Sequence, residues 1–284
     1  MELIKDCEFS GERVLFARHN LELVNVHIGL GESPLKKCSD IIARNCIFDG
    51  KYPFWHTDRF TVENCTFNIG ARSGPWYSKD CRMIDCKVEA PKLFREMDGV
   101  YVRRTDFPNG QEMFWNCRNI DLKDVRIDAC DYLFMNSRNI VIEDYEQHGN
   151  YSFQYAANVR IKNAKIYSKD AFWNTENVTV ENSLLDGEYL GWHSQNLTLI
   201  NCHILGTQPL CYARRLKFVN CTFGDDADLA FEESEVEADI VSPVVSVKNP
   251  KTGFINAPAI GNIIIDENLP SPGDCKITIT EAGQ

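Results

Sequence analysis

Tryptophan, tyrosine, histidine and asparagine gather in two adjacent columns when the sequence is aligned on a period near 20 residues. The first column holds all five tryptophans of the chain: Trp55, Trp76, Trp115, Trp173 and Trp192. The second column, one residue later, includes His56, Tyr77, Glu96, Asn116, Asn174 and His193. Flat aromatic rings stack on the apolar faces of sugar rings, and amides bond their hydroxyls. The pattern therefore predicts a carbohydrate-binding face, with ligand contacts from the five tryptophans, Tyr77 and Asn174.

Acidic and imidazole side chains beside these columns could perform hydrolytic chemistry. Cleavage of a glycosidic bond canonically uses two carboxyl groups, roughly 5–9.5 Å apart. Glu96 is the lone acid of its column, and Asp58 and Asp98 each lie two residues further along the chain. His56 and His193 could assist. These five are the catalytic candidates for an activity like that of a glycoside hydrolase or polysaccharide lyase, although each is also explained as an ordinary surface residue. The sequence leaves open whether the protein is an enzyme.

The tryptophan column has competing interpretations. Lys36, Arg95 and Gln154 share it, and burying an unpaired charge is costly, so the column should face outward with rings partly exposed. Exposed aromatic patches mark interaction sites of several kinds. The alternative to sugar recognition is a non-catalytic scaffold or homo-oligomer with no small-molecule substrate. Short corners throughout the repeat favour this alternative, because they build no deep pocket.

These columns must be positioned by a repeated element. Alternating apolar residues recur in units of 19–21 residues, with Asn or Asp at the sixth position of most units. The pattern is typical of strands and turns, and stacking places equivalent residues about 4.8 Å apart. It predicts an all-β parallel β-helix of about 12 coils, each with three short strands, over residues 1–224. The period is lost after Phe223, where an acidic run begins, so residues 225–284 are predicted to form a C-terminal capping segment with short strands.

The remaining composition narrows the partners. The net charge of −11 and the lack of a basic stripe argue against nucleic acid, and the chain has no apolar run long enough for a signal or a membrane span. Six cysteines share the seventh position of their units, where other units place Ala, Val or Ser: Cys7, Cys46, Cys65, Cys86, Cys202 and Cys221. That slot suits a small buried thiol rather than a metal ligand. We therefore expect no metal, no cofactor, reduced thiols and a cytoplasmic location.

The units with Asn-Cys-x-Phe, together with the tail around 245–250, 253–255 and 260–266, resemble a bacterial domain-of-unknown-function family. That family belongs with the pectin-lyase-like right-handed parallel β-helices, and the resemblance covers essentially the whole chain. It implies the right-handed coil. It implies no catalytic residue, because the family has no established activity, and the Gly-His-Gly pattern of related polysaccharide-degrading enzymes is missing.

Overall fold

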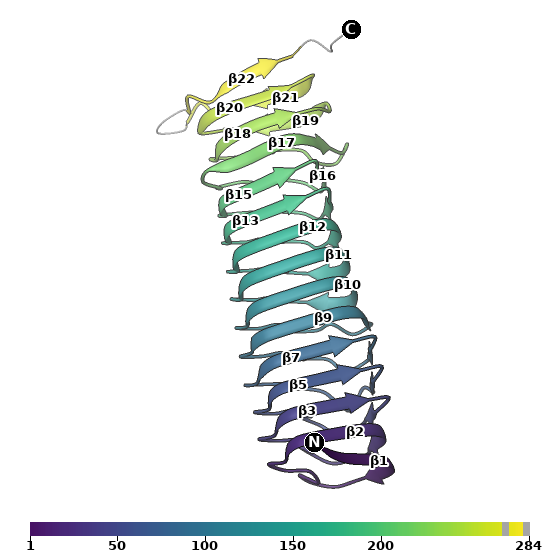
Figure 1. Ribbon diagram of the computed structural model, residues 1–284. Helices are drawn as coiled ribbons and strands as arrows, with labels where there is room; N and C mark the ends of the chain where they lie inside the picture. Colours follow the sequence, from purple (N-terminus) through teal and green to yellow (C-terminus); the bar gives the residue numbers. More distant parts are fainter. Residues whose placement is uncertain (269–272, 281–284) are drawn as a thin grey trace. The chain divides into compact units, whose positions relative to one another are not determined.

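The computed structural model describes residues 1–268 and 273–280, which form strands and turns without any helix (Figure 1). The chain divides into two compact units, Met1–His148 and Gly149–Gln284. Among the described residues, no helix offers the length and apolar character needed to cross a membrane. The all-β parallel solenoid predicted from the repeat is confirmed.

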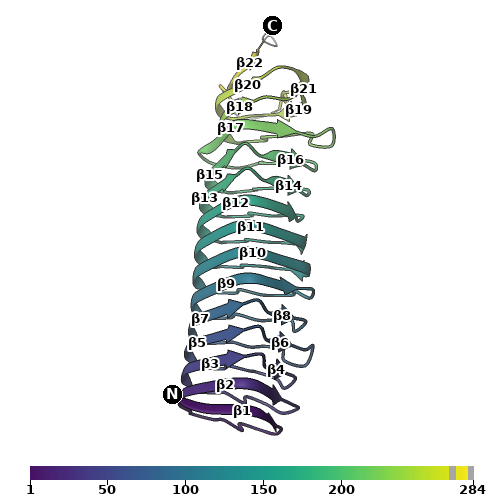
Figure 2. The ribbon, with the colours of Figure 1, turned by 45° about the vertical axis from the view of Figure 1, so that its right-hand side comes forward.

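The first unit is a stack of parallel strands in which each coil pairs with the coil that follows it in the sequence. Its strands are β1 Glu2–Phe9, β2 His19–Ile28, β3 Ser39–Arg44, β4 Ile47–Phe48, β5 Asp58–Glu63, β6 Thr66–Phe67, β7 Lys79–Ile84, β8 Lys87–Val88, β9 Asp98–Phe107 and β10 Arg118–Asp131. One side pairs β1, β2, β3, β5, β7, β9 and β10 in that order. A second side pairs the short strands β4, β6 and β8 (Figure 2). Equivalent repeat positions therefore lie directly above one another.

The second unit repeats the same arrangement. Its strands are β12 Ala157–Tyr167, β13 Glu176–Glu181, β14 Leu184–Asp186, β15 Gln195–Ile200, β16 His203–Leu205, β17 Leu216–Phe223, β18 Glu235–Ile240, β19 Val244–Lys248, β20 Thr252–Ala257, β21 Ile260–Ile264 and β22 Lys276–Ile279. Strand β11, Arg138–Asn150, includes the boundary between the two units. Parallel pairing runs through β12, β13, β15, β17, β18, β20 and β22.

The solenoid has about 14 turns, slightly more than the 12 predicted. The additional turns come from the tail, where β18 and β20 continue the parallel pairing beyond residue 224. Val236 pairs with Leu216 on one side and with Gly253 on the other, so the coil shortens there and the period seen earlier disappears. The role of residues 225–284 as a cap stays a prediction.

The third side of each coil is not a strand, contrary to the prediction of three strands per coil. It is an arc of turns held by isolated bridges such as Trp76 with Arg95. Left-handed backbone angles produce the arc: Glu112, Phe114 and Asn116 have φ between 51° and 58°. Alternation of left-handed and ordinary residues bends the chain too sharply for a continuous strand. Backbone N–H groups of the arc still donate to the neighbouring coil, as Tyr77 does to the Arg95 carbonyl and Glu96 to the Trp115 carbonyl, each at 2.9 Å.

Phenylalanine fills the core beside this arc. In the first unit Phe94, Phe114 and Phe134 are fully buried, and their rings stack with centroids 4.8 and 4.7 Å apart. In the second unit Phe153 and Phe172 stack in the same way, at 4.9 Å. The column that contains these phenylalanines is therefore part of the core.

Corner amides form a hydrogen-bonded ladder with a fixed direction. Asn64 donates to the Asn45 side-chain oxygen at 2.7 Å, Asn45 to Asn25 at 3.2 Å, and Asn25 to the Asp6 carboxylate at 2.9 Å. Asn64, Asn45, Asn25 and Asp6 all have positive φ, which Asn and Asp tolerate better than most residues. The carboxylate can only accept, so it ends the ladder.

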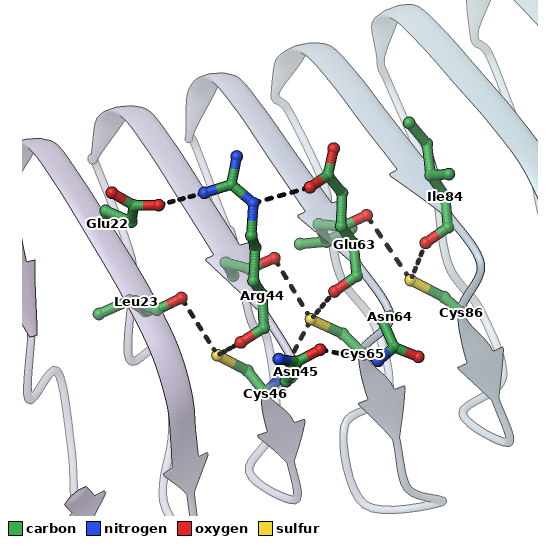
Figure 3. A network of polar contacts seen from close by, with 12 residues as sticks. Glu22, Leu23, Arg44, Asn45, Cys46, Glu63, Asn64, Cys65, Ile84 and Cys86 are labelled. Atoms are coloured by element: carbon green, nitrogen blue, oxygen red, sulfur yellow. Dashed lines mark hydrogen bonds and ion pairs between the residues drawn. The ribbon is translucent and has the colours of Figure 1, made fainter. Parts of the chain in front are cut away.

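The cysteine column is buried as predicted, except that Cys7 is half-buried. Cys46 donates from its thiol to the Leu23 carbonyl of the preceding coil at 3.6 Å (Figure 3). Outside this column, Arg44 lies between Glu22 and Glu63 and forms an ion pair with each (Figure 3). Opposite charges on adjacent strands thus support the register.

Thiol labelling should separate Cys7 and Cys275 from the other cysteines. All twelve cysteines are free, and only these two are not buried. Burial raises the pKa of Cys117, Cys130 and Cys211 to about 12, so their reactive thiolate form is scarce near neutral pH. A thiol reagent added without reductant should label two sites in the native protein and all twelve after denaturation. The variant with Cys7→Ser and Cys275→Ser should remain unlabelled when native, whereas disulfides or rapid labelling of the core would contradict the prediction.

Candidate functional site

All five indole side chains are half-buried, so the prediction of partial exposure is confirmed. The cations that share their column are nevertheless stacked on the rings. The Arg95 guanidinium lies 4.8 Å from the Trp76 ring centroid and 4.2 Å from that of Trp115. The Lys36 amine lies 4.2 Å from the Trp55 ring centroid. These charges are accommodated by cation–π contacts along the column, and their presence alone does not indicate free ring faces.

Hydrogen bonds hold two of the three tryptophans of the first unit, whereas Nε1 of Trp55 is buried without a hydrogen-bond partner among the described residues. Nε1 of Trp76 donates to the Lys92 carbonyl at 2.8 Å, and Nε1 of Trp115 donates to the Tyr132 carbonyl at 2.5 Å. Arg95 also forms an ion pair with Glu112. Trp76, Arg95 and Trp115 therefore form a packed wall, and the two indole rings are less open to a stacking ligand than free rings would be.

Electrostatics reinforce that wall. Burial opposes ionisation of Glu112, but hydrogen bonds from Lys92 and Arg95 outweigh it and lower the pKa of this carboxyl. Glu112 thus stays ionised at neutral pH and holds the Arg95 guanidinium between the rings.

The second unit carries its own aromatic cluster. Trp173 and Trp192 have ring centroids 5.6 Å apart and are tilted by 39°. Nε1 of Trp192 donates to the Gln208 carbonyl at 2.7 Å, and His193 stacks on Tyr212 at 5.1 Å. Asn174 is exposed beside this cluster. The predicted residues Trp173, Asn174, Trp192 and His193 therefore belong to a cluster within the second unit.

The exposed column of the first unit comprises His56, Tyr77, Glu96 and Asn116. His56 stacks on Tyr77, with ring centroids 5.2 Å apart. Asn116 donates to Glu96 Oε1 at 2.7 Å. Partial burial and then the charges of Lys36 and Lys37 lower the pKa of His56, so its ring is neutral at neutral pH. The column thus presents rings and hydrogen-bonding groups side by side.

A groove of about 330 Å³ opens beside this column. It is lined by Tyr77, Ser78, Lys79, Glu96, Met97, Asp98, Asn116 and Arg118. The structure thus brings Tyr77, Glu96 and Asp98 together, as three of the predicted site residues. Lys79 is the register partner of both Asp58 and Asp98, so two coil steps, about 9.6 Å, separate the backbones of these two aspartates.

Asp98 is already occupied by its neighbours. One carboxylate oxygen pairs with Arg118 at 3.0 Å, and the other accepts from Asn119 at 2.7 Å. An acid held by two partners is suited to orienting neighbouring groups. Among the described residues, Glu96 forms one side-chain hydrogen bond, with Asn116, and is therefore the more available of the two carboxylates in the groove.

The sequence interpretation missed Lys79, Arg118 and Asn116 as lining residues. Lys79 and Arg118 fall in the repeat position of Asp58 and Asp98, which gives a column of alternating charge. Alternating charge also occurs on surface columns that have no binding role. Only the adjacent Tyr77 and Glu96 could therefore have distinguished this column from those. Asn116 was visible in the second column but did not differ in type from the structural corner amides.

The fold and repeat define a parallel β-solenoid protein. The chain belongs to the family described as "Protein of unknown function (DUF3737)", whose model matches residues 2–278, and the suspected family resemblance is thereby confirmed. No curated protein matches the sequence.

Several solved β-helix structures are similar to the chain at low identity. Alginate lyase AlyF-OU02 in complex with G6 has a TM-score of 0.42 and 11% identity, covering 97% of this chain and 80% of that chain. A PL6 alginate lyase in complex with a trisaccharide has a TM-score of 0.39 and 10% identity, covering 93% and 79%. The mannuronan C-5 epimerase AlgE4 A-module of Azotobacter vinelandii has a TM-score of 0.29 and 10% identity, covering 98% and 91%. Similarity at this level does not assign a function to this chain.

Proposed function

We propose that the protein binds a carbohydrate in the groove beside the exposed column of the first unit. The observation that carries the proposal is the composition of one groove wall: the Tyr77 ring, the Asn116 amide and the Glu96 carboxylate line the same space. Its volume of about 330 Å³ lies within the range of small-molecule sites. Rings that cover an apolar sugar face, with amides and carboxylates for the hydroxyls, are the groups such a ligand needs.

Tyr77 is the stacking residue in this proposal. Its side chain is 49% exposed, more than the half-buried tryptophans, and its ring is braced by His56. Trp76 packs edge-on against Tyr77, with centroids 6.5 Å apart. The tryptophan column of the first unit then serves as the wall that fixes the backbone and Tyr77, while the second column contacts the sugar.

The polar groups of the groove fit recognition. Glu96 accepts from Asn116, which leaves further acceptor sites on the carboxylate for sugar hydroxyls. Lys79 and Arg118 also line the groove and add cationic donors. Both oxygens of Asp98 already accept contacts from neighbouring residues, so we propose that the groove binds a glycan. Hydrolase and lyase assays on the same glycans would test whether the protein also cleaves them.

Glycan binding by point variants tests the proposal. Tyr77→Ala should weaken binding to the glycan that the wild type selects from an array by about tenfold or more, because an aromatic anchor is lost. Glu96→Gln should also weaken it, because a charged acceptor is replaced by a neutral one. Affinities would be measured by calorimetry.

The matched control is Tyr155→Ala. Tyr155 occupies the same repeat column in the second unit, is 55% exposed and has a φ of 57°, against 53° for Tyr77. This control should bind as the wild type does. Loss of binding in Tyr155→Ala but not in Tyr77→Ala would move the site to the second unit, and the absence of any bound glycan would refute the proposal.

A scaffold function is the second candidate. The internal engagement of Trp76, Arg95 and Trp115 favours it, because these residues have structural partners without any ligand. A scaffold would self-associate through the exposed column, and light scattering at several concentrations would show a change in mass. We place the protein in the cytoplasm as part of this proposal, which its twelve free cysteines support.

A further inference from the structure

A glycine interrupts a column of polar side chains in the first unit. The column consists of the first residue of each repeat: Asn20, Asp40, Arg59, Asp80, Gly99, Asn119 and Asn139. Gly99 has a φ of +83°, and a Cβ atom there would lie 2.8 Å from Asp80 Oδ1. Without a side chain at this position, a hollow of about 460 Å³ remains beside β5, β7, β9 and β10. This hollow is distinct from the groove of the proposed function.

Two opposite charges line the hollow without neutralising each other. Asp80 and Arg82 lie two residues apart on β7, and both are exposed. In the described part of the chain, neither forms an ion pair or a side-chain hydrogen bond with another residue. Their backbones are about 7 Å apart, from the rise of a strand over two residues. A ligand in the hollow would meet one available cation and one available anion.

The other charged groups of the hollow already have partners. Arg59 donates twice to Asp40, at 2.7 and 2.8 Å. Asp121 accepts from Arg103 at 2.8 Å. These pairs are therefore less available to a ligand. The charges that remain available in the hollow are one anion, Asp80, and one cation, Arg82.

Tyr101 fixes the orientation of the free cation. The Arg82 guanidinium lies 4.1 Å from the Tyr101 ring centroid, and that of Arg103 lies 3.7 Å from it. A guanidinium stacked on a ring keeps its N–H edge available for a carboxylate. The same stacking engages the Tyr101 ring, so this hollow offers a sugar a poorer platform than Tyr77 does.

We propose that the hollow binds a compact zwitterion, with its carboxylate on Arg82 and its ammonium on Asp80. A free α-amino acid is the simplest ligand of this class. A ligand with a single charge would pair with only one of Asp80 and Arg82 and would leave the other without a partner. A zwitterion satisfies both, and charge-assisted hydrogen bonds are the stronger kind. The hollow at Gly99 supplies the space between and beside the two charges.

Calorimetry on the full chain tests this site, with the twenty L-α-amino acids as probes. For the amino acid that binds best, its amide and its des-amino acid would be measured alongside. Removing either charge from the probe should reduce affinity about tenfold or more, and so should Arg82→Gln or Asp80→Asn in the protein. Gly99→Asn should abolish binding, because it restores the side chain that the column carries in neighbouring coils and fills the hollow.

The control is Arg160→Gln, which removes an exposed arginine from the equivalent third repeat position in the second unit. It should bind the probe as the wild type does. Arg82→Gln and Asp80→Asn change exposed residues, so they test the site even if Gly99→Asn folds poorly. Failure of all twenty probes, equal binding of the des-amino acid, or unchanged affinity in Arg82→Gln would overturn the proposal. Glycan binding should persist in Arg82→Gln, which keeps this test separate from the groove of the proposed function.

Discussion

Phe114→Ala should lower the free energy of unfolding by about 3–5 kcal/mol, the usual cost of removing a fully buried aromatic ring. Phe114 is completely buried and stacks on Phe94 and Phe134, so the substitution leaves a cavity and breaks two ring contacts. The backbone angle should change little, because both residues carry a Cβ atom at the same φ of 58°. Denaturant unfolding followed by tryptophan fluorescence and by circular dichroism would measure the loss.

The matched control for this core substitution is Tyr77→Ala. Tyr77 is an aromatic residue of the same unit, with a φ of 53°, but its side chain is 49% exposed. Its replacement should cost less than about 1 kcal/mol, as for most surface changes. Equal losses in the two variants would show that the phenylalanine column does not dominate the stability of this unit.

Deletion of residues 225–284 should turn the protein into an aggregating species. The cut would remove β18, whose Val236 and Ala238 pair with Leu216 and Phe218 of β17. It would also remove Phe231, whose ring lies 5.6 Å from that of Phe218. An open strand edge beside an uncovered apolar core is a template for further pairing. Size-exclusion chromatography with light scattering would detect the aggregates.

A shorter deletion distinguishes capping from a general loss of chain. Removing residues 273–284 takes away β22, whose residues are exposed or half-buried, and leaves β18 and β20 in place. This variant should aggregate less than the variant that lacks residues 225–284. A soluble, well-folded protein without residues 225–284 would refute the predicted capping role.

Much of the fold was predictable because stacked coils bury the same repeat positions, so each coil needs an apolar residue at those positions. Leu23, Val62 and Val102 occupy one repeat position and are all buried, so a single interpretation covered many residues. The third side was mispredicted as strand for a physical reason. Its left-handed residues include Phe114 and Glu112, and neither type signals positive φ in a sequence. The surrounding packing imposes that angle.

The site was less predictable than the fold. Arg95 shared the tryptophan column, which correctly indicated an outward column but gave no sign that its guanidinium would stack between two rings. Gly99 read as one more glycine, because the space it leaves depends on side chains in adjacent coils. Contacts between coils decide both features, and a column of residue types does not specify them.

The direction of the corner amide ladder has a consequence for how the protein ages. Asparagine can lose ammonia and become aspartate, which replaces a donor with an acceptor. At Asn45 that change would set a carboxylate against the Asn25 oxygen it formerly donated to, while the bond from Asn64 could persist. Asp6, where the ladder ends, already is a carboxylate and is immune. Deamidation of Asn45 is therefore expected to break the hydrogen bond to Asn25, on the side toward the N-terminus. The hydrogen bond from Asn64, on the other side, should remain.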